Sequence, residues 1–258
     1  MIENIPTYPD LAGKVAVVTG GSGGIGAATC RLLTANGMRV AVNGRDETKI
    51  GAVVDEDGSN GGRAIGIAAD VTDFAAIERM RGRVEQELGP VDVLAVFAAS
   101  GGPPPGPTAQ ITEEEWRSAI DGNLTSTFLT LKSFLPGMIE RGRGSIVTMA
   151  SSAGRVLTPA PTAYAAAKAG VVMLSRQVAS EVGKHGVRVN CLAPDSILTG
   201  RIRRLMSEDQ QKQWAAMFPL GRMGAPEDVA LATLFLASES SSWVTGVTLD
   251  VAGGKIML

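Results

Sequence analysis

Short apolar runs alternate with longer amphipathic segments along most of this 258-residue chain. The apolar runs have the length of strands, and continuous apolar runs are typical of strands buried on both faces of a sheet. They cover residues 15–18, 39–42, 64–68, 91–97, 145–149, 187–192 and 247–251. Helix-length segments lie between them, at residues 25–36, 47–57, 74–88, 113–141, 163–184 and 226–237. This alternation predicts a doubly wound, parallel α/β sheet of about seven strands with helices on both faces.

The chain length and the helix starts fit one domain spanning residues 1–258. A single α/β domain of this size is common and buries a large core. Thr112 to Glu115 has the pattern of a capping box, and Pro226 places a proline in a first helical turn. The Gly/Pro-rich stretch 101–107 falls within the alternation. We interpret it as a loop at the carboxyl edge of the sheet, where open α/β sheets bind ligands.

The composition narrows the class of function. Hydrophobic residues make up 45% and charged residues 19%, and the net charge is −2 without any basic block. This balance argues against nucleic acid or an acidic membrane as a partner and favours a small-molecule substrate. No apolar stretch has the length that a bilayer needs and no secretory signal begins the chain, so we expect a cytoplasmic protein. Cys30 and Cys191 show neither disulfide nor metal-ligand spacing, which predicts buried thiols and no metal site.

A glycine-rich turn at residues 19–26 follows the first predicted strand and opens the first helix. In that context backbone N–H groups and the helix N-terminus can hold a pyrophosphate. The same residues fit G-x-S-x-G at positions 20–24, so a serine hydrolase with Ser22 as its nucleophile is the alternative from another class. That enzyme would need a catalytic histidine. The chain has only His185, which we expect to be a solvated loop residue.

Tyr164 and Lys168 lie one helical turn apart in an alanine-rich segment and so share a helix face. A free tyrosine has a pKa of about 10 and donates its proton poorly at neutral pH unless a nearby cation favours the phenolate. Ser151 lies thirteen residues before Tyr164, just past the apolar run 144–149. Moving a hydride between a nicotinamide and a carbonyl carbon leaves charge on the oxygen, which needs a proton and a polarising donor. Tyr164 is the natural acid.

Together these features resemble the short-chain dehydrogenase/reductase family, from about Gly13 to Gly254. The glycine turn matches the family pattern T-G-x-x-x-G-x-G, and further matches are Val187 to Asn190, Gly221-Arg222, Pro226 to Asp228 and Gly246. The resemblance implies four catalytic residues: Asn123, Ser151, Tyr164 and Lys168. By this resemblance Ser151 binds the carbonyl oxygen, Lys168 holds the ribose and lowers the tyrosine pKa, and Asn123 anchors a proton relay through water. The Ser-x-x-Gly spacing to Gly154 selects Ser151 over Ser152.

The resemblance also implies a dinucleotide site. Its residues are Gly20, Ser22, Gly24, Ile25, Gly26, Gly44, Arg45, Asp70, Val71, Ala98, Tyr164, Lys168, Pro194, Ile197 and Thr199. NAD-preferring relatives carry a carboxylate where this chain has Gly44, and Arg45 follows with a fork suited to phosphate. NADP(H) is therefore favoured. NAD(H) stays open, because Asp46 could serve if the register differed by two residues. Asp70 could equally be a turn former.

Three places depart from the family pattern, at residues 96–99, at Asp195 and at Ala252, and none of them removes a catalytic group. The resemblance implies a Rossmann-type, NADPH-dependent reductase that converts a ketone to a secondary alcohol, similar to 3-oxoacyl-carrier-protein and polyketide-type ketoreductases. One alternative is a dehydrogenase that oxidises a sugar or steroid-like alcohol. Another is a binding module that keeps the cofactor site without turnover.

Two further expectations concern assembly and substrate access. Relatives commonly form tetramers through two long helices and the last strand. Ala166, Ala169 and Val172 offer small surfaces for such packing, and the apolar end 256–258 is costly to leave in water, so we expect a homotetramer. The substrate is a small ketone or alcohol that could be carrier-bound. Residues 195–218 lie where this family places its mobile lid, with an apolar face formed by Met206, Trp214, Met217 and Phe218; a fixed core helix is the alternative.

Overall fold

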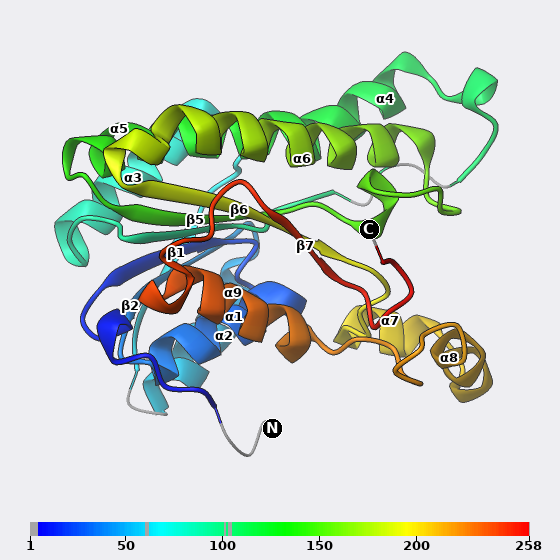
Figure 1. Ribbon diagram of the computed structural model, residues 1–258, viewed down its shortest axis with the longest axis horizontal. Coiled ribbons are helices and arrows are strands. Elements are labelled where there is room, and N and C mark those ends of the chain that lie inside the picture. The colour runs from blue at the N-terminus through cyan, green and yellow to red at the C-terminus, as the bar shows by residue number, and fades with distance from the viewer. Residues whose placement is uncertain (1–4, 60–61, 101, 103–104, 258) are drawn as a thin grey trace.

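The computed structural model describes residues 5–59, 62–100, 102 and 105–257 (Figure 1). Within them, seven strands form one parallel sheet in the order β3-β2-β1-β4-β5-β6-β7. The strands are β1 (Val15–Thr19), β2 (Arg39–Gly44), β3 (Arg63–Ala68), β4 (Val93–Val96), β5 (Gly144–Met149), β6 (Val187–Pro194) and β7 (Thr248–Val251). The predicted doubly wound Rossmann-type sheet is confirmed.

Helices cover both faces of the sheet (Figure 1). One layer holds α1 (Gly24–Ala35), α2 (Glu47–Ser59) and α9 (Pro226–Ala237), and the other holds α3 (Phe74–Glu87), α4 (Glu113–Ile120), α5 (Ser126–Glu140) and α6 (Thr162–Val182). Two short helices, α7 (Gly200–Leu205) and α8 (Glu208–Ala215), lie beyond the carboxyl ends of the strands. Short 3-10 turns are η1 (Pro9–Leu11), η2 (Thr108–Gln110), η4 (Ser152–Gly154), η5 (Gly183–His185) and η6 (Glu239–Ser241).

The central strands are buried because each helix layer packs an apolar core against its own face of the sheet, whereas the edge strands β3 and β7 are only partly buried. β1 shows the pattern fully, since all five of its residues are buried. Successive side chains of a strand point to opposite faces, so a continuous apolar run feeds both cores at once. The predicted burial of Cys30 and Cys191 is confirmed, and His185 is exposed as expected.

The predicted helix 113–141 is interrupted by a π turn, η3 (Asp121–Thr125), between α4 and α5. The capping box at its start is confirmed, with Thr112 accepting from the Glu115 backbone N–H. Within the turn the backbone carbonyl of Asn123 accepts the hydroxyls of Ser126 and Thr127. Single π turns often occur at functional sites. Helical periodicity does not reveal one, because the apolar face continues through it.

No helix in the described part of the chain is long and apolar enough to cross a bilayer. Of the Gly/Pro-rich stretch 101–107, residues 101, 103 and 104 lie outside the described residues, as do 1–4, 60–61 and 258.

Asp57 of α2 is 1% exposed, and neither of its carboxylate oxygens makes a hydrogen bond to the described residues. The hydroxyl of nearby Thr34 donates instead to the backbone carbonyls of Cys30 and Arg31. Burial raises the pKa of Asp57 from 3.8 to about 6, with Thr34 opposing the shift. The folded protein therefore holds this proton more tightly than the unfolded chain does. That stabilisation is complete below about pH 3.8 and is lost as the pH rises to about 6.

We expect Asp57→Asn to stabilise the protein at pH 7.5 by up to about 3 kcal/mol, because two pKa units correspond to roughly that free energy. The unfolding temperature should rise by roughly 2 to 6 °C at pH 7.5, and this gain should shrink toward pH 4.5. Thermal unfolding at both pH values measures it, with the exposed Asp55→Asn as the matched control on the same helix. An equal gain at both pH values would show that Asp57 is not the titrating group.

Candidate active site

Ser151 and Tyr164 meet where the turn after β5 packs against α6. Ser151 is the N-cap of η4, and its Oγ accepts from the backbone N–H of Ala153 at 3.3 Å. A Cβ on Gly154 would lie 2.5 Å from the backbone carbonyl carbon of Lys168, so only glycine lets this turn approach the helix so closely. The approach brings the Ser151 hydroxyl close enough to the Tyr164 phenol to lower the pKa of the phenol. This contact explains the serine-to-glycine spacing in the sequence.

Lys168 lies beneath Tyr164 and is 2% exposed. Its Nζ donates to the backbone carbonyl of Met149 at 2.9 Å and lies 5.6 Å from the centroid of the tyrosine ring. Burial lowers the pKa of Lys168 to about 8, so the ammonium is the main form at neutral pH. The hydrogen bond ties α6 to the carboxyl end of β5. The face of α6 that carries Tyr164 is therefore fixed to the sheet by the Lys168 ammonium. The family resemblance assigns the same ammonium to cofactor binding.

The expected lowering of the Tyr164 pKa by Lys168 is not found. Burial raises the pKa of Tyr164, and only the hydrogen bond with Ser151 lowers it. The ammonium is directed at the Met149 carbonyl and is itself desolvated, so little of its charge acts on the phenol. A buried phenol with a raised pKa keeps its proton at neutral pH, as a proton donor to an alkoxide must.

Asn123 occupies the π turn and is fully buried. Its Nδ2 donates to the Ser100 carbonyl at 2.9 Å, to Ser100 Oγ at 3.1 Å and to the Ala119 carbonyl at 2.8 Å. Its Oδ1 is buried without a partner among the described residues. A buried amide oxygen that lacks a donor is a natural place for a bound water. This arrangement suits the relay predicted for Asn123, which stays a prediction.

Ser100 is a positioning residue that the sequence did not indicate. It lies four residues after the end of β4, and both its carbonyl and its hydroxyl accept from the amide of Asn123. Gly122 lies against it, since a Cβ there would collide with Ser100 Oγ. A single serine after a strand carries no distinctive pattern, so only the fold reveals its partner.

The glycine turn after β1 forms a tight backbone cradle. Gly20 has a φ of 69°, and a Cβ there would lie 2.9 Å from the backbone nitrogen of Ala98. A Cβ on Gly26 would collide with the carbonyl oxygen of Gly20. The Thr19 hydroxyl joins this turn to β4 by accepting from the backbone N–H groups of Phe97 and Ala98, at 3.0 and 3.2 Å. Residues 96–99 therefore differ from the family pattern in their side chains, but their backbone N–H groups still bind the Thr19 hydroxyl.

A cavity of about 290 Å³ runs along the carboxyl edge from the glycine turn to the end of β3. It brings together seven of the predicted cofactor residues: Gly20, Ser22, Gly44, Arg45, Asp70, Val71 and Ala98. Asp70 is exposed and accepts from the backbone N–H and the hydroxyl of Thr72, so it also forms the turn that was its alternative role. These hydrogen bonds hold the pKa of Asp70 below its usual value.

Gly44 is the last residue of β2, and a Cβ there would lie 2.6 Å from Ser22 Oγ. The site therefore accepts no carboxylate at position 44 unless Ser22 shifts. Asp46, the alternative carboxylate, caps α2 by accepting from the Lys49 backbone N–H at 3.1 Å and pairs with the Lys49 ammonium at 2.9 Å. Arg45 is exposed on the cavity and makes no ion pair within the described residues.

The remaining predicted cofactor residues lie outside this cavity. Thr199 packs its methyl group 3.2 Å from the Cβ position of Gly24, which joins the start of the lid segment to the glycine turn. Ile25 follows in the first turn of α1, and Pro194 is the last residue of β6. Ile197 is buried and forms a parallel bridge with Gly224.

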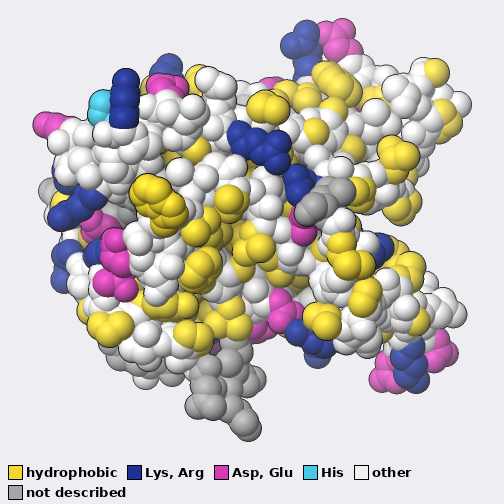
Figure 2. Space-filling model, viewed as in Figure 1, with side chains coloured by type: hydrophobic (Ala, Val, Ile, Leu, Met, Phe, Trp, Pro, Cys, Tyr) yellow, Lys and Arg dark blue, Asp and Glu magenta, His cyan; other side chains and the backbone are white. Residues whose placement is uncertain are grey.

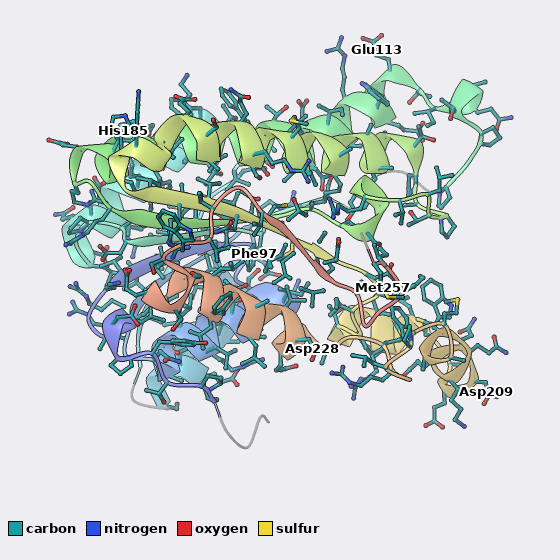
Figure 3. The ribbon with its side chains drawn as sticks, viewed as in Figure 1. Phe97, Glu113, His185, Asp209, Asp228 and Met257 are labelled. Carbon is teal, nitrogen blue, oxygen red and sulfur yellow. The ribbon has the colours of Figure 1, made fainter. Side chains whose placement is uncertain are left out.

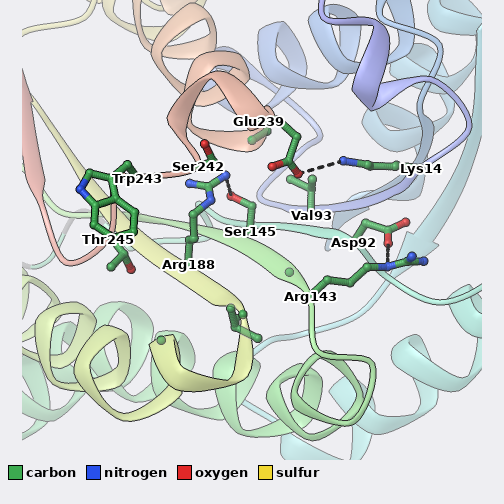
Figure 4. Close-up of a pocket in the computed structure, with 15 residues that line it drawn as sticks. Lys14, Asp92, Val93, Arg143, Ser145, Arg188, Glu239, Ser242, Trp243 and Thr245 are labelled. Carbon is green, nitrogen blue, oxygen red and sulfur yellow. Dashed lines mark hydrogen bonds and ion pairs between the residues drawn. The ribbon is translucent and has the colours of Figure 1, made fainter.

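Another cavity, of about 390 Å³, opens at the opposite edge of the sheet (Figure 4). It lies at the amino ends of β4, β5 and β6 and holds the ion pairs Lys14–Glu239 at 3.6 Å and Arg143–Asp92 at 3.3 Å. None of the predicted site residues lines it. His185 precedes β6 at the same edge and lies far from the cavity at the carboxyl edge (Figure 3). Ser22 follows β1 at the carboxyl edge. The serine hydrolase alternative is therefore excluded.

The comparisons with known proteins agree with this geometry. A family model described as enoyl-(acyl carrier protein) reductase matches residues 20–255. The 3-oxoacyl-(acyl-carrier-protein) reductase of Escherichia coli strain K12 is 37% identical over 249 residues, which cover 96% of this chain and 100% of that protein. This chain belongs to the short-chain dehydrogenase/reductase family.

Other members of the family are similarly close. The 2,5-dichloro-2,5-cyclohexadiene-1,4-diol dehydrogenase of Sphingobium indicum is 38% identical over 95% of this chain and 98% of its own length. A solved structure of 7α-hydroxysteroid dehydrogenase, complexed with NADH and 7-oxo glycochenodeoxycholic acid, superposes with a TM-score of 0.90 and 32% identity, covering 97% of each chain. As a member of this family, the protein is an NAD(P)-dependent oxidoreductase that acts on CH–OH and C=O groups.

The residues present fit a nicotinamide dinucleotide. The backbone cradle at Gly20 and Gly26 tolerates no side chain, and it opens the N-terminus of α1, where the N–H groups of a helix favour phosphate. The buried ammonium of Lys168 and the phenol of Tyr164 share one face of α6. When bound, the nicotinamide supplies or accepts the hydride. Tyr164 would then be the expected proton donor and Ser151 the expected partner of the carbonyl oxygen.

We expect Tyr164→Phe to lower turnover by about 10² to 10⁴, because it deletes the general acid, while cofactor affinity changes by less than about threefold. Ser151→Ala should lower turnover, and Ser152→Ala, the matched control, should change it much less. Lys168→Ala should harm both turnover and cofactor binding. Steady-state kinetics and cofactor fluorescence titration measure the two effects. If the phenylalanine variant kept more than about a tenth of native turnover, Tyr164 would not be the acid.

Proposed function

We propose that this protein is an NADPH-dependent reductase that converts a ketone to a secondary alcohol. The observation that carries the proposal is the end of β2, where Gly44 leaves no carboxylate and the free guanidinium of Arg45 faces the cofactor cavity. A reductase draws on NADPH as its usual hydride source. The similarity to 3-oxoacyl-(acyl-carrier-protein) reductases supports an acyl ketone, free or carrier-bound, as the substrate class.

In the proposed reaction, Ser151 donates a hydrogen bond to the ketone oxygen and Tyr164 gives the proton that completes the alcohol. Lys168 holds the ribose of the cofactor and keeps α6 in register with β5 through Met149. Asn123 anchors the water that returns a proton toward the tyrosine. Each group lies at the carboxyl edge of the central strands, which is where this class of sheet binds its ligands.

A second candidate is the oxidation of a steroid-like alcohol. It is favoured by the likeness to a 7α-hydroxysteroid dehydrogenase whose structure holds NADH and a 7-oxo bile acid. The end of β2 distinguishes the two candidates, because a ribose-binding carboxylate favours NADH and a guanidinium favours NADPH. Consumption of NADPH with a panel of 3-oxoacyl thioesters, compared with NAD⁺ reduction by hydroxysteroids, is the direct test.

We expect NADPH to bind about ten- to a hundredfold more tightly than NADH, because a charge-assisted pair with phosphate contributes roughly 1.5 to 3 kcal/mol. Arg45→Ala should abolish most of this preference by weakening NADPH alone. Lys49→Ala removes a nearby exposed cation, one that already pairs with Asp46, and serves as the matched control. Fluorescence titration of both cofactors gives the constants. Equal affinities in the native protein would contradict the proposed cofactor.

We also propose that the protein forms a homotetramer. Six of the exposed large apolar side chains outside the lid lie in two places, on α4, α5 and α6 and in or just before β7. They are Trp116, Phe128 and Met173 in the first, and Trp243, Val247 and Leu249 in the second. Figure 2 shows hydrophobic side chains gathered over the β7 side of the molecule. Patches of this kind on a monomer mark interfaces. Two patches suit a tetramer with two kinds of contact.

The structure corrects one detail of the expected interface. Ala166 and Ala169 are exposed on α6, but Val172 is buried within its own subunit, and the neighbouring Met173 is exposed instead. Ile256 is likewise buried, whereas Met257 is 82% exposed. Leu258 lies outside the described residues.

Light scattering should give a mass of about four times the 26.7 kDa of the chain at micromolar concentration. Leu249→Glu should reduce this mass, because it places a charge in the β7 patch. Ile5→Glu is the matched control, since Ile5 and Leu249 are 40% and 39% exposed. A native mass of 26.7 kDa would rule out the tetramer.

A further inference from the structure

Asp195 is one of the three departures from the family pattern, and it begins the segment 195–218 that we expect to form the substrate lid. Its side chain is only 5% exposed. One carboxylate oxygen accepts from the Ser196 backbone N–H at 2.7 Å, from the Ser196 hydroxyl at 2.8 Å and from the Lys255 ammonium at 3.1 Å. Burial raises the pKa of Asp195, but hydrogen bonds from Ser152, Ser196 and Lys255 outweigh it and leave the pKa lowered. The buried carboxylate is thus charged and held from three sides.

Lys255 reaches this carboxylate from the C-terminal segment that follows β7. Its side chain is 31% exposed, and its Nζ also lies 5.1 Å from the centroid of the Phe218 ring. Phe218 is the last residue of the lid segment and is buried. One ammonium therefore touches the first residue of the segment through an ion pair and the last residue through a cation–π contact.

The backbone at the base of the lid holds Lys255 in position. Leu198 and Ser196 exchange backbone hydrogen bonds with Gly224, at 2.7 and 3.1 Å, and the Leu220 N–H donates to the Gly253 carbonyl at 3.2 Å. A Cβ on Gly254 would lie 3.0 Å from the ring of Pro219. The C-terminal turn is therefore packed directly onto the end of the lid.

A second buried ion pair fixes this base to the catalytic serine segment. Arg155, four residues after Ser151, makes two hydrogen bonds of 3.0 Å to the carboxylate of Asp250 on β7. Both side chains are nearly buried, at 13% and 12% exposed. A bidentate pair in a buried setting is geometrically strict. The two ends of the lid segment, the C-terminal segment after β7 and the turn that carries Ser151 are thus joined to one another. Lys255 is the residue that contacts both ends of the lid segment.

The lid itself projects beyond these contacts as α7 and α8 (Figure 3). Its apolar side chains are only partly buried, since Trp214 is 38% and Met217 is 47% exposed. This exposure argues against a core position for Trp214 and Met217, two of the four apolar residues, whereas Phe218 is buried as the fixed-helix alternative expects. A segment with so few buried contacts opens at low energetic cost. The contacts at its two ends therefore determine where it lies relative to the sheet.

We propose that Lys255 is a positioning residue that latches the base of the lid by joining Asp195 to Phe218. It sets how far the segment 195–218 opens and therefore governs ketone binding more than the chemical step. The expected change in ketone binding rests on the proposed function. The expected change in the position of the lid segment rests on the structure alone. Loss of the latch leaves Asp195 with its serine hydrogen bonds, so the fold should survive the substitution.

The mechanical consequence is measured on Trp214, without any substrate. The chain has three tryptophans, so Trp116→Phe with Trp243→Phe leaves Trp214, which lies in the lid segment, as the sole tryptophan to be excited selectively. In this background Lys255→Met should raise acrylamide quenching of Trp214, and the rate of tryptic cleavage at Arg203 and Arg204, about two- to fivefold. Lys255→Arg should restore native values, because the guanidinium keeps both contacts.

The matched control is Lys14→Met. Lys14 is also 31% exposed and ion-paired, but it lies at the opposite edge of the sheet. Asp195→Asn should behave like Lys255→Met, and the double variant should add little to either, because both remove the same pair. The latch is contradicted if Lys255→Met changes neither the quenching of Trp214 nor the rate of cleavage, as expected for Lys14→Met. It is also contradicted if the effects of Lys255→Met and Asp195→Asn are fully additive in the double variant.

The kinetic consequence is a split between KM and kcat. Lys255→Met should raise KM for the best ketone about three- to tenfold while kcat changes less than about twofold, and Lys255→Arg should recover the native KM. A fall in kcat that matches the rise in KM would place Lys255 in the chemistry and overturn the positioning role. If no ketone is reduced by the native protein, the proposed function fails, while the Trp214 readout still decides the latch.

Discussion

The buried ammonium of Lys168 is the interaction on which the active site depends. An isolated charge in a protein interior costs several kcal/mol, and this one is retained because its Nζ donates to the Met149 carbonyl. The hydrogen bond joins α6 to the end of β5, and Ser151 follows β5 directly. The same group that fixes the helix to the sheet therefore sets the distance between the serine and the tyrosine. Removing it would loosen the frame as well as the cofactor site.

Backbone packing completes that frame at positions where side chains would intrude. Gly154 lets the serine turn lie against the backbone of α6, and Gly122 leaves room for the Ser100 hydroxyl. The π turn between α4 and α5 then places Asn123 in the interior with its amide held by Ser100. Its second polar atom is left for a water. The polar groups of the site are thus held in place by hydrogen bonds to the backbone and to neighbouring side chains, a condition that favours preorganised catalysis.

Charges are distributed differently at the two ends of the cleft. Arg45 lines the cofactor cavity and makes no ion pair in the described part of the chain, although its charge helps to lower the pKa of Asp70. At the substrate end, the ion pairs Asp195–Lys255 and Arg155–Asp250 neutralise their own charges and hold the lid base together. The apolar lid surface around Trp214 and Met217 is what remains to meet the substrate. This contrast is consistent with the proposed phosphate-bearing cofactor at one end and the proposed ketone at the other.

The sequence by itself determined the order of the elements, because a strand buried on both faces is mostly apolar, and β1 and β4 show this most directly. It also indicated Ser151, Tyr164 and Lys168 as candidate catalytic residues, because the short spacings between them can be recognised in the sequence. The tertiary structure alone decided what depends on contacts between distant segments. It placed Ser100 on Asn123, showed that burial rather than Lys168 governs the Tyr164 pKa, and brought Lys255 to Asp195. Sixty residues separate that last pair, and no periodicity within either segment encodes their meeting.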